Sequence, residues 1–222
     1  MRVFASSEAL AEALADAVAV ALQTRLQRDG QAALAVSGGT TPLKFFEALS
    51  HQNLNWAAVS VTLVDDRWVA ESSSRSNAAS VRRHLLKNRA AEARFLPLVT
   101  AAATPEEGRD AVNRAVASLV LPLAAVVLGM GTDGHTASFF PGGDRLAQAL
   151  APAPGVVVET MRAEAAIEPR ITLTLPVLLE AEFVALHIEG DTKRHVLENI
   201  TSAMPVAAVL KRQPAPEIFW SP

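Results

Sequence analysis

Residues 32–42 read AALAVSGGTTP, an apolar run that ends in two glycines, two threonines and a proline. A short run in which every side chain is apolar is typical of a strand buried on both faces, as in a parallel sheet covered by helices. Pro42 suits the first turn of a helix, where its missing N–H costs nothing, and Thr41 is placed to cap that helix. The stretch therefore predicts a strand–turn–helix unit of an α/β fold.

The same alternation continues in both directions along the chain. We expect further strands over residues 2–5, 59–64, 124–128, 156–159, 171–174, 183–188 and 217–220. We expect helices from Ser6 or Ser7 to Gly30, over 78–86, from the capping box at Thr104 to about Val120, over 176–180 and over 192–199. No linker, repeat or low-complexity tract divides the chain. The pattern predicts a single α/β domain over residues 1–222, with a mostly parallel sheet covered by helices on both faces.

Composition excludes several classes of protein. The chain has 222 residues, 50% of them apolar, and it contains no Cys, which excludes disulfide scaffolds, thiolate metal sites and Cys nucleophiles. Its 20 basic and 23 acidic residues give no electrostatic basis for a nucleic-acid partner. No apolar run is long enough to span a membrane, and Glu8, Glu12 and Asp16 make the first segment unlike a signal peptide. We expect a cytoplasmic protein with no membrane partner.

Polar clusters follow four of the predicted strands. They are Ser37-Gly38-Gly39-Thr40-Thr41, Asp65-Asp66-Arg67, the run from Gly129 to His135, and Glu189-Gly190-Asp191-Thr192-Lys193. Ligands of parallel α/β sheets bind beyond the carboxyl ends of the strands. The four clusters therefore predict one converging site.

The SGGTT loop is a candidate anion site. Two glycines let the backbone approach a ligand closely, and the free N–H groups of the next helix start point toward it. Lys193 lies just after the predicted start of its own helix, where the helix dipole disfavours a cation unless an anion is bound. Arg170 is a further candidate for the same phosphate. The alternatives are an ordinary tight turn and two solvated surface charges.

The run GMGTDGH admits two interpretations. Gly129, Gly131 and Gly134 satisfy the dinucleotide pattern G-x-G-x-x-G, with Glu159 as the ribose-binding acid. Against this, Asp133 would lie beside the pyrophosphate, and the sequence Pro-Gly-Gly at 141–143 interrupts the required helix. The other interpretation makes His135 a general base oriented by Asp133, because imidazole titrates near neutrality.

The remaining titratable candidates favour no metal. No two His stand at ligand spacing, and Arg67 beside Asp65-Asp66 favours an internal ion pair over a Mg²⁺ site. We expect His187 to be a hydrogen-bonded core residue and His195 at most to line the pocket.

Five stretches in family order resemble 6-phosphogluconolactonases, within the wider glucosamine-6-phosphate isomerase/deaminase superfamily. They are AVSGGTTP (35–42), DDRWV (65–69) with SRSN (74–77), LGMGTDGHTASFFPG (128–142), RITLT (170–174) and EGDTK (189–193). The resemblance implies a modified Rossmann-like sheet, no metal or organic cofactor, and hydrolysis of 6-phospho-D-glucono-1,5-lactone to 6-phosphogluconate in the oxidative pentose phosphate pathway.

The resemblance also implies roles for particular residues. The SGGTT loop, Arg170 and Lys193 would hold the substrate phosphate, His135 would be the catalytic base, and Asp65 matches the proton-transferring Asp of the deaminases. The deaminases need a carboxylate five residues after the motif His, where this chain has Phe140. That difference favours a lactonase, while a deaminase and a non-catalytic sugar-phosphate sensor stay open. The resemblance leaves the roles of Asp66 and Arg67, the oxyanion donors and the oligomeric state undecided.

Overall fold

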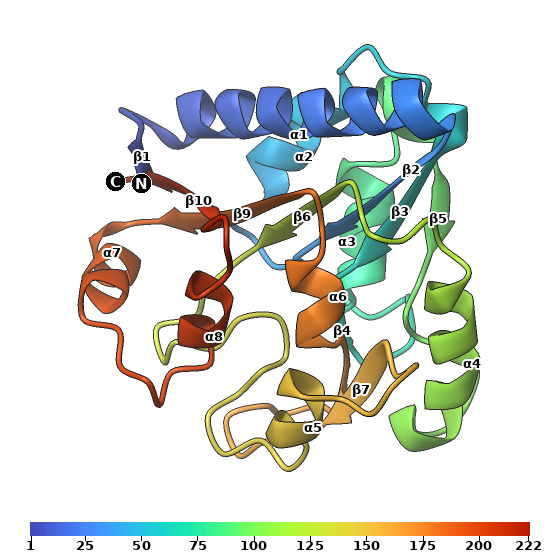
Figure 1. The fold of residues 1–222 in the computed structure, drawn as a ribbon, viewed down its shortest axis with the longest axis vertical. Helices are drawn as coiled ribbons and strands as arrows, with labels where there is room; N and C mark the ends of the chain where they lie inside the picture. Colours follow the sequence, from blue (N-terminus) through green and yellow to red (C-terminus); the bar gives the residue numbers. More distant parts are fainter.

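A computed structural model describes all residues from 1 to 222, and its centre is a seven-stranded parallel sheet (Figure 1). In spatial order the strands are β1 (Arg2–Val3), β10 (Glu217–Ser221), β9 (Phe183–Glu189), β6 (Ala125–Leu128), β2 (Ala32–Val36), β3 (Val59–Leu63) and β5 (Arg94–Leu96). Every residue of β2 and of β6 is buried. The continuous apolar runs therefore have the predicted cause, a parallel sheet enclosed on both faces.

Helices enclose this sheet. Figure 1 shows α1 (Ser7–Asp29) and α2 (Leu43–Ser50) above it, with α6 (Leu175–Leu179), α7 (Asp191–Glu198) and α8 (Val206–Leu210) below. The other helices are α3 (Asn77–His84), α4 (Pro105–Ala117), α5 (Leu146–Leu150) and two short 3-10 helices, Trp56–Ala58 and Asn88–Glu92. The Ser6 side chain accepts from the N–H of Ala9 to cap α1, which ends at the left-handed Gly30 as predicted. None of the helices is long and apolar enough to cross a membrane.

A second sheet differs from the prediction. The strands β4 (Asp65–Arg67), β8 (Arg170–Leu173) and β7 (Val158–Met161) form a separate antiparallel sheet in the order β4-β8-β7. The sequence pattern placed 156–159 and 171–174 with the parallel strands. An apolar run indicates burial and does not encode which strand pairs with it, so this prediction of pairing was wrong.

Two local predictions also need correction. Pro42, and not Thr41, is the residue before α2, and no side chain caps that helix; the Thr41 hydroxyl contacts Lys193 instead. Thr104 does cap α4, but Glu107 accepts from the N–H of Ala103 and not from that of Thr104. Both predictions are therefore off by one residue, toward the C-terminus at α2 and toward the N-terminus at α4.

The order of the parallel strands creates a crevice between β2 and β6. From β2 the chain proceeds outward through β3 to β5, then returns to β6 on the other side of β2 and continues to β9 and β10. Loops that leave adjacent strands in opposite directions separate beyond the carboxyl ends, which is where ligands of open α/β sheets bind.

Candidate active site

A cavity of about 590 Å³ opens at this crevice. Its lining comes from loops after β2, β6 and β9 and from the small antiparallel sheet. Of the twelve residues predicted to bind substrate, act in catalysis or brace the site, eleven line it: Ser37, Gly38, Gly39, Thr40, Thr41, Asp65, Arg67, Asp133, His135, Arg170 and Lys193. The exception is Asp66, which is fully buried behind the lining. The four clusters therefore converge as predicted, although only Lys193 of the cluster at 189–193 lines the cavity.

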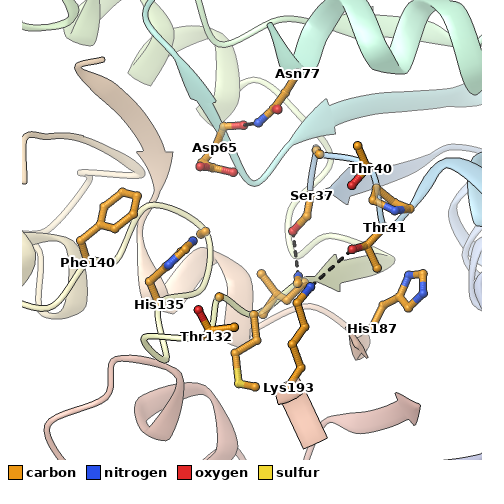
Figure 2. A pocket seen from close by; sticks show the side chains of 18 of the residues that line it. Ser37, Thr40, Thr41, Asp65, Asn77, Thr132, His135, Phe140, His187 and Lys193 are labelled. Carbon is orange, nitrogen blue, oxygen red and sulfur yellow. Dashed lines mark hydrogen bonds between the residues drawn. The ribbon is translucent and has the colours of Figure 1, made fainter. Parts of the chain in front are cut away.

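The loop after β2 forms one end of the cavity (Figure 2). The Ser37 hydroxyl accepts from the N–H of Gly129 at 3.0 Å, which ties this loop to the one after β6. The Lys193 ammonium donates to the Thr41 hydroxyl at 3.4 Å, and burial lowers the pKa of Lys193. Two hydroxyls, the backbone of Gly38 and Gly39 and one half-buried cation therefore meet at a place suited to an anion.

The run from Gly129 to His135 forms a closed turn. The Gly131 N–H donates to the carbonyl of His135 at 2.9 Å, and Gly134 adopts a φ of 78°, which favours glycine. No helix follows directly, since α5 begins only at Leu146. Glu159 lies in β7, where its carboxylate meets Arg109 at 3.5 Å. The dinucleotide interpretation is therefore wrong, because it requires a helix N-terminus at the third glycine.

Asp133 holds the His135 ring in one orientation. Its Oδ1 lies 2.6 Å from His135 Nδ1 and accepts from the backbone N–H of His135 at 3.1 Å. Burial alone would raise the pKa of Asp133, but the His135 backbone and imidazole outweigh it and keep that pKa below its usual range. No protein group bonds to His135 Nε2. With Nδ1 bound to the carboxylate, Nε2 is the nitrogen left to accept a proton.

Phe140 packs against both His135 and Arg170. Its ring centroid lies 4.6 Å from that of His135, and the Arg170 guanidinium carbon lies 5.4 Å from the Phe140 centroid. Arg170 forms no ion pair within 4 Å, its buried Nε has no acceptor, and burial lowers its pKa. These contacts place Arg170 at the His135 side of the cavity. Its assignment to the phosphate stays a prediction.

Asp65 and Asp66 have different environments. Asp65 faces the cavity, where its Oδ2 accepts from the Ser138 hydroxyl at 2.6 Å. Asp66 accepts from the backbone N–H groups of Arg67 and Asn77 at 2.8 Å and of Ala78 at 3.1 Å. Burial dominates over these bonds and raises the pKa of Asp66 to about 6. Since both Asp66 oxygens already accept backbone N–H groups, the pair does not present a shared set of oxygens for Mg²⁺.

Arg67 does not form the expected ion pair with either aspartate. Its guanidinium donates to the carbonyl of Arg75 at 2.7 Å, and its buried Nε has no acceptor. Arg67 follows Asp66 along an antiparallel strand, so these two side chains point to opposite faces, whereas Asp65 lies on the same face as Arg67 and bonds the Ser138 hydroxyl instead. Arg67 is thereby directed to the cavity while Asp66 caps α3 from behind.

Three further residues correct or extend the sequence analysis. His187 is buried and lies 2.9 Å from Glu189, which confirms its prediction as a hydrogen-bonded core residue, but it also lines the cavity. His195, expected at most to line the cavity, does not line it. Asn77 lines the cavity, although the sequence predictions gave it no role beyond its place in the SRSN stretch that precedes a helix. Nothing in the spacing of polar residues distinguishes such an asparagine from a helix-capping one.

The chain is similar to known proteins over nearly its full length. A family model described as glucosamine-6-phosphate isomerases/6-phosphogluconolactonase matches residues 5–220. A 6-phosphogluconolactonase of Rhizobium meliloti is 50% identical, over 100% of this chain and 98% of the relative, and one of Pseudomonas aeruginosa is 41% identical, over 100% and 94%. The crystal structure of a 6-phosphogluconolactonase from Shewanella baltica superposes with a TM-score of 0.96 at 38% identity, covering 100% of this chain and 97% of the other.

Proposed function

The chain belongs to the glucosamine-6-phosphate isomerase/6-phosphogluconolactonase family of enzymes, and from that membership we propose that it hydrolyses 6-phospho-D-glucono-1,5-lactone to 6-phosphogluconate, with His135 as general base. The observation that carries the mechanism is the Asp133–His135 pair, which opens onto the same cavity as the SGGTT loop and Lys193. We assign this reaction to the oxidative pentose phosphate pathway, which is what membership of the family implies.

Phosphate binding positions the lactone. Lys193 and the backbone and hydroxyls of residues 37–41 hold the phosphate, whose charge offsets both the desolvation of the ammonium and its unfavourable place in the first turn of α7. A ligand fixed at this end extends toward His135, because both ends line one cavity. Positioning of this kind lowers the barrier without any covalent step.

Neutral His135 takes a proton from a water molecule through Nε2, and the water oxygen attacks the lactone carbonyl carbon. Asp133 stabilises the imidazolium that forms, since its carboxylate lies on Nδ1. The imidazolium then gives its proton to the ring oxygen as the carbon–oxygen bond breaks. General acid–base help of this kind contributes about 10²–10⁴-fold.

The carbonyl oxygen becomes negatively charged in this step, and the product is a carboxylate. The backbone N–H groups of Met130 and Thr132 in the turn donate to no other protein group and are candidate donors, and the guanidiniums of Arg67 and Arg170 line the same cavity. The Asp65 carboxyl, held by Ser138, lies close enough to interact with Arg170 and so braces that side of the site.

The loss of freshly generated 6-phosphogluconolactone, followed with and without the protein in buffer that contains a chelator, tests this proposal. We expect loss well above the spontaneous rate and no effect of the chelator. Folded protein that gives no excess loss would contradict it. Release of ammonia from glucosamine 6-phosphate would then identify a deaminase, and binding of 6-phosphogluconate without turnover would identify a sensor.

A further inference from the structure

Asn77 is a buried polar residue of the cavity that the mechanism above does not use. Its residue exposure is 4%, and it stands at the first position of α3. In Figure 2 it lies beside Asp65, on the side of the cavity that also holds Ser37. Buried side-chain amides in proteins nearly always have their hydrogen-bonding groups satisfied.

The orientation of the Asn77 amide follows from its neighbours. Its Nδ2 lies 3.0 Å from the backbone carbonyl of Asp65. A carbonyl can only accept, so the nitrogen and not the oxygen must face Asp65. The opposite atom, Oδ1, receives no hydrogen bond from any protein donor.

Asn77 also packs directly against Gly38 of the SGGTT loop. A Cβ atom added to Gly38 would stand 2.0 Å from Asn77 Oδ1, so this glycine is required because the amide occupies the space of a side chain. The amide therefore spans the gap between Gly38 at the phosphate end and Asp65 at the end near Arg170. A sugar-phosphate lactone bound from Lys193 to His135 would place its ring carbons across that gap.

We propose that Asn77 is a specificity-determining residue that hydrogen-bonds one ring hydroxyl of the substrate, its Oδ1 accepting and its second Nδ2 hydrogen free to donate. The proposal rests on the proposed function, since it assumes a hydroxylated lactone that carries a phosphate. A hydroxyl is the matching partner because it both donates and accepts. A site that hydrogen-bonds a substrate hydroxyl rejects analogues that lack it, since the buried amide is then left unpaired.

A cycle of variant and substrate changes tests the contact. The kcat/KM of the wild-type protein and of Asn77→Ala is measured for 6-phosphogluconolactone and for its 2-deoxy, 3-deoxy and 4-deoxy forms. We expect the wild type to lose about tenfold on one deoxy lactone. Asn77→Ala should lose about tenfold on the full lactone and nothing further on that same deoxy form.

A purely structural role of Asn77 gives a different result. Removal of its bond to Asp65 would then lower activity on all four lactones by one common factor, and losses that multiply in every cycle would overturn the proposal. Asn113→Ala is the matched control, because that amide bonds the Gly155 carbonyl at 3.1 Å and the Val157 N–H at 2.8 Å away from the cavity. It should leave the substrate pattern unchanged.

Two measurements keep the inference separate from the proposed function. If Asn77→Ala does not fold, the wild type alone still decides, because equal activity on all four lactones contradicts a hydroxyl contact. If the wild type hydrolyses none of them, the proposed function fails. The same cycle is then run on calorimetric binding of 6-phosphogluconate and its deoxy forms, where additive losses overturn the role of Asn77.

Discussion

The cavity has two walls of different construction. The loop wall, made of residues 37–41, residues 129–135 and Lys193, follows three strands of the large parallel sheet. The strand wall, made of Asp65, Arg67 and Arg170, belongs to the small antiparallel sheet. The loop wall offers glycines, hydroxyls and the partly exposed Asp133–His135 pair, whereas the strand wall offers charged side chains that are mostly buried.

The two walls depend on different forces. In the loop wall, function depends on backbone shape, as at Gly134, where the φ of 78° and the nearby Met204 leave no room for a side chain. In the strand wall, charged groups are buried away from water. Burial of a charge lowers the stability of the folded protein unless partners compensate it. Changes in the loop wall should therefore alter turnover or substrate affinity, and changes in the strand wall should alter stability and its dependence on pH.

Replacing His135 in the loop wall should give the largest effect. His135→Ala removes the proton acceptor, so we expect kcat to fall about 10²–10⁴-fold with KM and thermal stability nearly unchanged. Stopped-flow or polarimetric assay of lactone loss, corrected for the spontaneous rate, measures this. His195→Ala, outside the cavity, should behave as wild type. Near-normal turnover by His135→Ala would remove the general-base role.

Asp66, which supports the strand wall from behind, should affect stability through pH. Its pKa rises from 3.8 in the unfolded chain to about 6 in the folded protein. Between these values the folded state holds a proton that the unfolded state has released, so the free energy of unfolding falls as pH rises through that window. A shift of this size corresponds to about 3 kcal/mol at most.

Asp66→Asn cannot titrate and should lack this dependence. The free energy of unfolding of wild type and variant is measured with denaturant at several pH values. The excess of the wild-type value over that of the variant should be greatest below pH 4 and shrink toward pH 7. Asp110→Asn, an exposed carboxyl in α4, is the control and should keep the wild-type profile. A wild-type advantage that grows with pH would show that the three backbone N–H donors outweigh burial.

The two walls also differed in how well the sequence predicted them. The loop wall follows from local signals, since glycines and hydroxyls after a buried run mark a turn at the carboxyl end of a strand, as at Ser37 and Gly129. The strand wall depends on pairing between Arg67 and Arg170, two residues far apart in the chain. Local periodicity does not indicate which strands pair. Arg170 therefore lines the cavity as predicted, but the antiparallel sheet that carries it was not predicted.

Lys193 tests whether the loop wall binds phosphate. Lys193→Met keeps the length of the side chain without its charge, so we expect KM for the phosphorylated lactone to rise about 10–100-fold. Hydrolysis of glucono-1,5-lactone, which has no phosphate, should not change. Lys44→Met, an exposed lysine of α2, serves as control. The same pair of substrates applied to Arg170→Met decides which end of the lactone that arginine serves.

The smallest effect is expected where the two walls meet. Ser138, from the long loop after β6, donates to the Asp65 carboxylate of the strand wall at 2.6 Å, and both residues are buried. Ser138→Ala leaves that carboxylate one donor short, but Arg170 still provides a nearby positive charge. We expect a loss of about 1–2 kcal/mol in the free energy of unfolding and a modest fall in kcat/KM, measured by denaturant titration and lactone assay.

Ser118→Ala, at the end of α4, is the control, since its hydroxyl bonds only the local carbonyl of Ala115. A loss of activity as large as that of His135→Ala would mean that Asp65 takes part in the chemistry itself, and the division of labour between the walls would no longer hold.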